Sequence, residues 1–204
     1  MIDGAGRLTR VRFFIILQGM KKLVLSLIAP VFAGCLTSAP LEIVDWPVEF
    51  SNRSFEPPAE VLGTLRVSQV VVSQPYDSRE FVVLRSDGSL ARDAYNRFAD
   101  SPAQLLKGPT INAFVASGRF AEVVGSSSSA ASEFSAEATI TKLAFDCRAG
   151  KREALVEIRI KLLDRARAIV KTCSGVGTCA IGDDYGAAFG EAFSDAIASA
   201  LKGL

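Results

Sequence analysis

The sequence predicts an α+β fold: an antiparallel sheet with two main helices packed on one face, after a signal peptide and an extended tether. Residues 154–162 alternate apolar with mostly charged side chains, which is typical of a strand with one buried face. Residues 183–201 carry large apolar side chains at four-residue spacing, which predicts an amphipathic helix. A second helix start is indicated by Ser101-Pro102-Ala103-Gln104.

The other strands follow from short valine-rich or apolar runs bounded by turn residues. They are predicted at residues 65–72, 80–84, 120–124, 134–145 and 167–172. The last two flank residues 154–162, so the three segments should form an antiparallel meander. A hairpin-like turn is expected at residues 86–89, and the Ser-rich stretch 125–132 predicts a flexible surface loop.

Both predicted helices have recognisable ends. Ser101 should cap the first one, with Gln104 reaching back, and Gly118 should end it. Gly108-Pro109 lies inside this helix and predicts a kink or a split. Asp183 or Asp184 should cap the C-terminal helix.

The N-terminal region reads as an export signal. Two lysines after Met20, an apolar run over residues 23–32 and the small residues before Cys35 are typical of a secretory signal. A cysteine directly after the cut resembles the lipobox of bacterial lipoproteins, although Phe32 stands where leucine is usual. We therefore expect Cys35 to carry acyl chains; the alternative is an ordinary cleaved signal with an incidental cysteine. Leu36 is not the aspartate that marks inner-membrane retention, which favours the outer membrane.

The predicted organisation has four parts. Residues 1–19 fit the signal poorly and are interpreted as an upstream extension that is not translated, residues 20–34 as the signal peptide, 35–62 as the lipidated N-terminus and tether, and 63–204 as the domain. Four prolines in the third part predict an extended tether with little regular structure.

Composition limits the possible functions. Without residues 1–34 the chain has 18 basic and 21 acidic side chains, a net charge of −3 with no basic stripe, which argues against a nucleic-acid partner. The chain contains no histidine, which excludes Ser-His-Asp and Cys-His catalysis and removes the commonest metal ligand. No cofactor is expected. In an oxidising compartment Cys173 and Cys179 can close a short loop as a disulfide, although Cys147 leaves the pairing open.

Three segments then resemble the ABC-type transport auxiliary lipoprotein family, which includes the paraquat-inducible protein C type. They are residues 74–85, QPYDSREFVVLR, residues 94–106, AYNRFADSPAQLL, and residues 117–124, SGRFAEVV. The resemblance covers roughly residues 64–202. Arg97-Phe98-Ala99 stands where many members have Arg-Trp-Ala, and residues 42–50 lack the Tyr-x-Leu strand that members often carry.

The resemblance implies a non-enzymatic lipoprotein of the outer membrane that faces the periplasm. Its expected partners are ABC transporter subunits and a periplasm-spanning MCE-domain protein that moves phospholipid or similar hydrophobic cargo, and ring-like homo-oligomers are implied as well. The matching residues that become candidates for the partner surface are Tyr76, Asp77, Arg79, Arg85, Tyr95, Arg97 and Phe98. Each aromatic residue has an alternative role in the core, and Arg79 and Arg85 have one on a solvated strand edge.

Two other functions compete with this interpretation. One is a lipid-binding carrier that holds its cargo between the helices and the sheet. The other is an envelope hydrolase that uses carboxylates such as Asp183 and Asp184, which as helix caps would have a simpler role.

Overall fold

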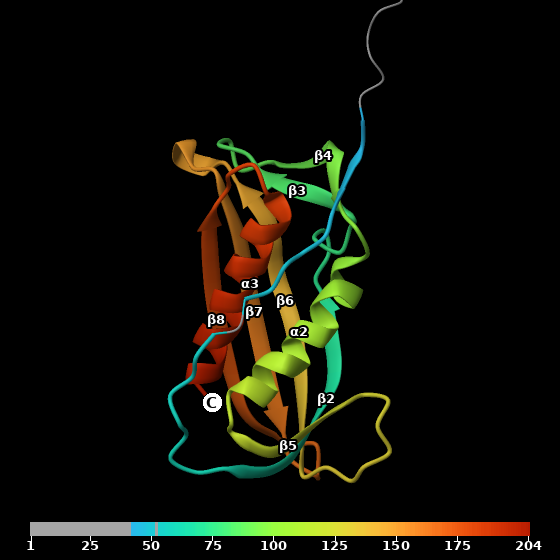
Figure 1. The fold of residues 1–204 in the computed structure, drawn as a ribbon, viewed down its shortest axis with the longest axis vertical. Coiled ribbons are helices and arrows are strands. Elements are labelled where there is room, and N and C mark those ends of the chain that lie inside the picture. Colours follow the sequence, from blue (N-terminus) through green and yellow to red (C-terminus); the bar gives the residue numbers. More distant parts are fainter. Residues whose placement is uncertain (1–41, 52) are drawn as a thin grey trace, which may run out of the picture. The chain divides into compact units, whose positions relative to one another are not determined.

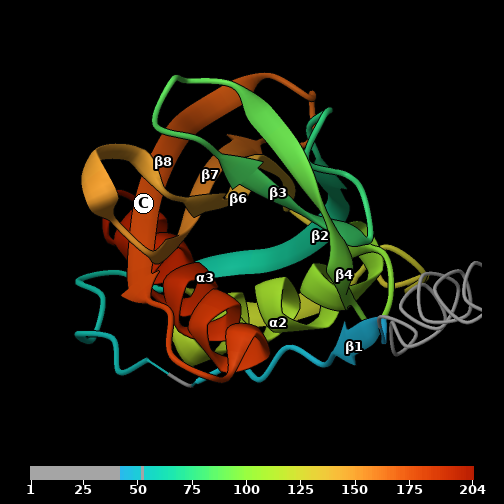
Figure 2. The same cartoon turned by 90° about the horizontal axis from the view of Figure 1, so that it is seen from above.

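The predicted α+β class is confirmed: an eight-stranded sheet carries two helices on one face (Figures 1 and 2). The computed structural model describes residues 42–51 and 53–204. The expected signal peptide, lipidated Cys35 and start at Met20 lie outside them. The described elements are β1 (Val44–Trp46), β2 (Leu62–Val72), β3 (Glu80–Leu84), β4 (Leu90–Phe98), α2 (Pro102–Ala116), β5 (Phe120–Gly125), β6 (Phe134–Asp146), β7 (Glu153–Leu163), β8 (Ile169–Ala180) and α3 (Tyr185–Lys202).

Strand β6 organises the sheet. On one side it pairs antiparallel with β7 along its length, and β7 pairs antiparallel with β8, so the predicted meander is confirmed. On its other side β6 pairs in parallel with β2 near its start and with β3 near its end. Beyond β2 lies β5, and beyond β3 lie β4 and then β1. The sheet therefore contains both parallel and antiparallel pairs. Strands β2 and β5 lie beside the start of β6, and strand β3, followed by β4 and β1, lies beside its end.

Helix α2 differs from expectation at its start and in its middle. The backbone amides of Gln104 and Leu105 donate to the backbone carbonyl oxygen of Ser101. The Ser101 side chain makes no capping hydrogen bond, so the predicted side-chain cap is wrong. The helix runs continuously through Pro109, so of the two predicted alternatives, a kink or a split, the split is wrong. Gly118 adopts a φ of +62° directly after the helix, as a glycine stop requires.

The predicted disulfide between Cys173 and Cys179 is wrong. Both residues lie on β8, six positions apart in an extended strand, which separates their Cα atoms by about 20 Å. A disulfide needs Cα atoms closer than about 7 Å. Cys147, Cys173 and Cys179 are free thiols in the structure. The segment between them is a strand rather than a loop.

The small residues of β8 have a packing role instead. Gly175 and Gly177 lie directly against α3: a Cβ atom built on either would come within 1.9 Å of a helix carbonyl oxygen, that of Ala196 or Ala192 respectively. Ala192 and Ala196 are themselves fully buried. Strand and helix therefore approach each other more closely than any larger side chain permits.

The segment expected as a free tether packs on the domain from Ile43 onward. We call residues 43–51 and 53–58 the strap; it lies over the helices on the side away from the sheet (Figure 2). The Trp46 ring lies 5.0 Å from that of Tyr185, and the Phe50 ring lies 5.5 Å from that of Phe193. Ile43–Leu204 forms one compact unit, so the domain begins earlier than the predicted boundary at residue 63.

Candidate functional site

Two arginines of the recognised motif hold the start of the strap. Asp45 on β1 accepts hydrogen bonds from Arg97 on both carboxylate oxygens, at 2.5 and 3.1 Å, and from Arg79 at 2.9 Å. Arg79 also donates to the carbonyl oxygens of Phe98 and Ala99, at 3.1 and 3.0 Å. We call Asp45, Arg79 and Arg97 the latch. It fixes β1 beside β4, where Val44 stands opposite Asn96 in a parallel register.

Acid should open the latch. The hydrogen bonds from Arg97, and the nearby charge of Arg79, hold the pKa of Asp45 below its ordinary value of 3.8. A carboxylate with a lowered folded-state pKa adds stability above its ordinary pKa, and this stability is lost as the pH falls toward the folded-state value. Trp46 is the only tryptophan of the chain, so its emission should stay constant down to about pH 4 and shift to the red below it.

The matched variant for this titration is Asp45→Asn. Its emission should already be shifted at neutral pH and should lack the acid step, because the amide cannot form the same charge-assisted pairs. An identical acid titration in Asp45→Asn and the wild type would show that the latch does not hold the strap.

A bulge in β4 lies beside the latch. The β3–β4 register places Val82 opposite Arg92 but Glu80 opposite Arg97, so the residues between are displaced from the ladder. One Asp93 carboxylate oxygen accepts the backbone amides of Tyr95 and Asn96, at 2.8 and 3.0 Å. Asn96 in turn accepts the indole N–H of Trp46 at 2.9 Å. The bulge leaves Tyr95 45% exposed.

Two of the seven predicted surface residues are core residues. Tyr76 and Phe98 are 9% and 3% exposed. The Phe98 ring lies 4.5 Å from that of Phe81 and 5.0 Å from that of Phe189, in tilted or edge-to-face arrangements that aromatic pairs prefer. Assigning Tyr76 and Phe98 to a partner surface was therefore wrong. Their position in a motif reflects packing.

The other five candidates divide by their contacts. Arg79 and Arg97 belong to the latch, so their guanidinium groups are already engaged with Asp45. Asp77, Arg85 and Tyr95 are exposed to solvent. Asp77 follows the turn after β2, Arg85 begins the β3–β4 turn, and Tyr95 lies in the bulge. The structure thus leaves three predicted residues available to a partner.

The sequence analysis did not identify four residues that form the latch or order the β4 bulge beside it. They are Asp45, Trp46, Asp93 and Asn96. Asp45 and Trp46 lie in the segment that was interpreted as a tether. The one sequence feature that argued against a free tether was Trp46, because a large aromatic side chain in a solvated tether has nothing to pack on. Asp93 and Asn96 carry the Asx pattern that often closes turns against the backbone.

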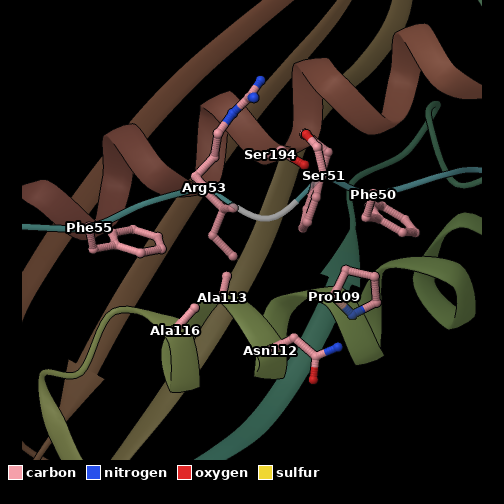
Figure 3. A pocket seen from close by; sticks show the side chains of 11 residues that line it. Phe50, Ser51, Arg53, Phe55, Pro109, Asn112, Ala113, Ala116 and Ser194 are labelled. Atoms are coloured by element: carbon pink, nitrogen blue, oxygen red, sulfur yellow. The ribbon is translucent and has the colours of Figure 1, made fainter.

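A cavity of about 130 Å³ lies between the strap, α2 and α3 (Figure 3). Its apolar lining includes Phe50, Phe55 and Ile197. At its rim Arg53 bonds to Glu191, and also to Asp195 at 2.8 Å. Binding sites for drug-sized ligands usually occupy about 300–1,000 Å³. The cavity is therefore smaller than a two-chain lipid requires, and it lies between the helices rather than between helices and sheet.

One of the two carboxylates considered for hydrolysis, Asp184, caps helix α3, whereas Asp183 is exposed beside it. Asp184 accepts the backbone amide of Ala187 at 2.9 Å, as a helix cap does. Within residues 42–51 and 53–204, no group of acidic or cysteine side chains is arranged to hold a metal ion. None of the helices in these residues has the length and apolar composition needed to cross a bilayer.

Comparison with known proteins defines the class of fold. No family model and no curated protein matches the sequence. A crystal structure of a Xanthomonas campestris protein assigned to DUF330 matches with a TM-score of 0.60 and 20% identity, over 79% of this chain and 92% of the other. A PelC dodecamer from Paraburkholderia phytofirmans matches with a TM-score of 0.43 and 15% identity, over 74% and 95%. The chain therefore shares its fold with the DUF330 structure.

Proposed function

We propose that this chain is an accessory lipoprotein of an envelope transport system. In this proposal Cys35 anchors it to the periplasmic face of the outer membrane, and the domain docks an MCE-domain protein that works with an ABC transporter. The role involves no catalysis, and assembly into homo-oligomers follows from the same resemblance. The fold shared with the DUF330 structure is compatible with this proposal.

The latch is the observation that carries the proposal. Arg79 and Arg97 belong to two separate segments of the family resemblance, yet both bind Asp45. Asp45 lies ten residues after Cys35. The motif arginines therefore hold the segment that follows the proposed lipidation site, which is the arrangement an anchored docking module needs.

The anchor is tested by Cys35→Ala. Without the thiol no acyl chain can be attached, so the variant should appear in the soluble periplasmic fraction, whereas the wild type sediments with outer membranes. If the signal is instead an ordinary cleaved one and Cys35 is incidental, the wild type and the variant should both be soluble. Sedimentation of the variant with outer membrane would contradict the anchor.

Docking is tested separately on the exposed charged candidates. We expect Arg85→Glu to reduce recovery of an MCE-domain protein or transporter subunit from solubilised envelope, because it reverses an exposed charge at the candidate surface. Arg165→Glu is the matched control, since it reverses an exposed charge in the turn between β7 and β8. Failure of the wild-type protein to recover either partner would count against the docking role. Native mass spectrometry of the same material tests the carrier alternative, which requires bound phospholipid.

A further inference from the structure

Two groups of neighbouring exposed apolar side chains stand out in the described part of the chain, whereas Val61, Leu90, Val115 and Val176 are exposed elsewhere. Ile43 and Tyr95 lie where β1 meets β4, and we call them the corner patch; they are 52% and 45% exposed. They are neighbours because the β1–β4 register, with Val44 opposite Asn96, places Ile43 beside Tyr95. Ile169 and Val170, at the start of β8, form the second group and are 57% and 55% exposed.

The two groups lie at opposite ends of the sheet (Figure 1). The last residue of β6, Asp146, pairs with Leu84 of β3, next to β4 and β1. Near the start of β6, Ser135 pairs with Leu163, which in turn pairs with Ile169. The 13 residues of β6 therefore separate the two ends by about 40 Å.

Chain length decides which end can reach a membrane. Eight residues lead from Cys35 to Ile43, and at full extension they span at most about 29 Å. The strap keeps the residues after Ile43 from adding to this reach, because it is packed on α3 and held by the latch. If Cys35 carries the anchor, the corner patch lies within reach of the bilayer and the start of β8 does not.

We propose that the corner patch is a membrane-contact surface that rests on the phospholipid headgroup region. This inference rests on the proposed lipid anchor. Tyrosine is favoured at the membrane interface, where its ring is apolar and its hydroxyl stays hydrated. Arg92, half-exposed beside the bulge, pairs with Glu80 at 3.4 Å and would exchange this partner for a lipid phosphate at the membrane. Two side chains bind a bilayer weakly, but an anchored chain needs only a weak contact because its effective concentration at the surface is high.

The test uses Trp46, the only tryptophan, which lies two residues from Val44. The lipidated mature protein is reconstituted into vesicles of phosphatidylethanolamine and phosphatidylglycerol that contain phospholipid with brominated acyl chains, which quench tryptophan only at short range. We expect clear quenching in the wild type and its loss in the double variant Ile43→Ser and Tyr95→Ser. The matched control, Ile169→Ser with Val170→Ser, should be quenched like the wild type.

Each outcome decides the inference. An unquenched wild type, or equal quenching in the wild type and the corner variant, overturns it. Loss of quenching in the β8 control alone overturns it too, since the far end would then contact lipid. Flotation of the vesicles tests the anchor separately from the membrane contact. Protein that floats without quenching refutes only the contact. Protein that does not float refutes the anchor and the contact together. Circular dichroism of the variants checks that they remain folded.

Discussion

Gly175→Val should lower the free energy of unfolding by about 3 kcal/mol or more, at the upper end of the range for overpacked cores. A Cβ atom at this position would lie 1.9 Å from the carbonyl oxygen of Ala196 and 2.6 Å from the amide nitrogen of Ala200. Both are backbone atoms of α3, so no flexible side chain can move aside. The helix would have to shift away from β8 and open the core between them. For a domain of this size the melting temperature should fall by about 6–12 °C.

Two other glycines provide controls for this variant. Gly182 has no heavy atom within 4 Å of its Cβ position, so Gly182→Ala should change the free energy of unfolding by no more than about 0.5 kcal/mol. Gly108 lies inside α2 with the same free space, and Gly108→Ala should stabilise the protein by about 0.5–1 kcal/mol. A Gly175→Val protein that melts with the wild type would disprove the close packing of β8 on α3.

The same glycines show why part of the fold was not readable from the sequence. The alternation in β7 and the four-residue spacing in α3 were predicted correctly, because each pattern is local and reflects one buried face. The inner face of β8 has the opposite composition, Cys173, Gly175, Gly177 and Cys179, which resembles a loop. Its small residues are explained only by a helix that follows later in the chain.

The candidate site was predicted in part for a similar reason. Of the residues that the resemblance nominated, Asp77, Arg85 and Tyr95 are exposed, and their role in binding a partner stays a prediction. The resemblance did not separate these from the buried Phe98, because a motif records both packing and contact residues. It also did not reveal Asp45, since β1 has three residues and pairs with β4 about fifty positions later. Such a long-range pairing leaves no periodic pattern in either segment.

Gly190→Val should release the strap from α3. The Cβ position of Gly190 lies 1.6 Å from the carbonyl oxygen of Glu49, so any side chain there excludes the strap from its present path. Lifting the strap would expose Trp46 and Phe50, and burying a large apolar side chain contributes about 1.5–3 kcal/mol. We expect a loss of about 3 kcal/mol in the free energy of unfolding, a red shift of Trp46 emission and new trypsin cleavage after Arg53.

Ser199→Val is the matched control, because it places the same β-branched side chain at an exposed position of α3. It should leave the Trp46 emission and the trypsin pattern unchanged. If Gly190→Val also kept both, the strap would not depend on its seat at Gly190. If the strap is released, the free chain after Cys35 lengthens well beyond eight residues, and its maximum reach rises by about 3.3–3.6 Å for each residue freed. Gly190→Val should then lose the bilayer quenching of Trp46 while Cys35 still anchors the protein. This result would separate the role of the anchor from that of the strap, which sets the height of the domain above the membrane.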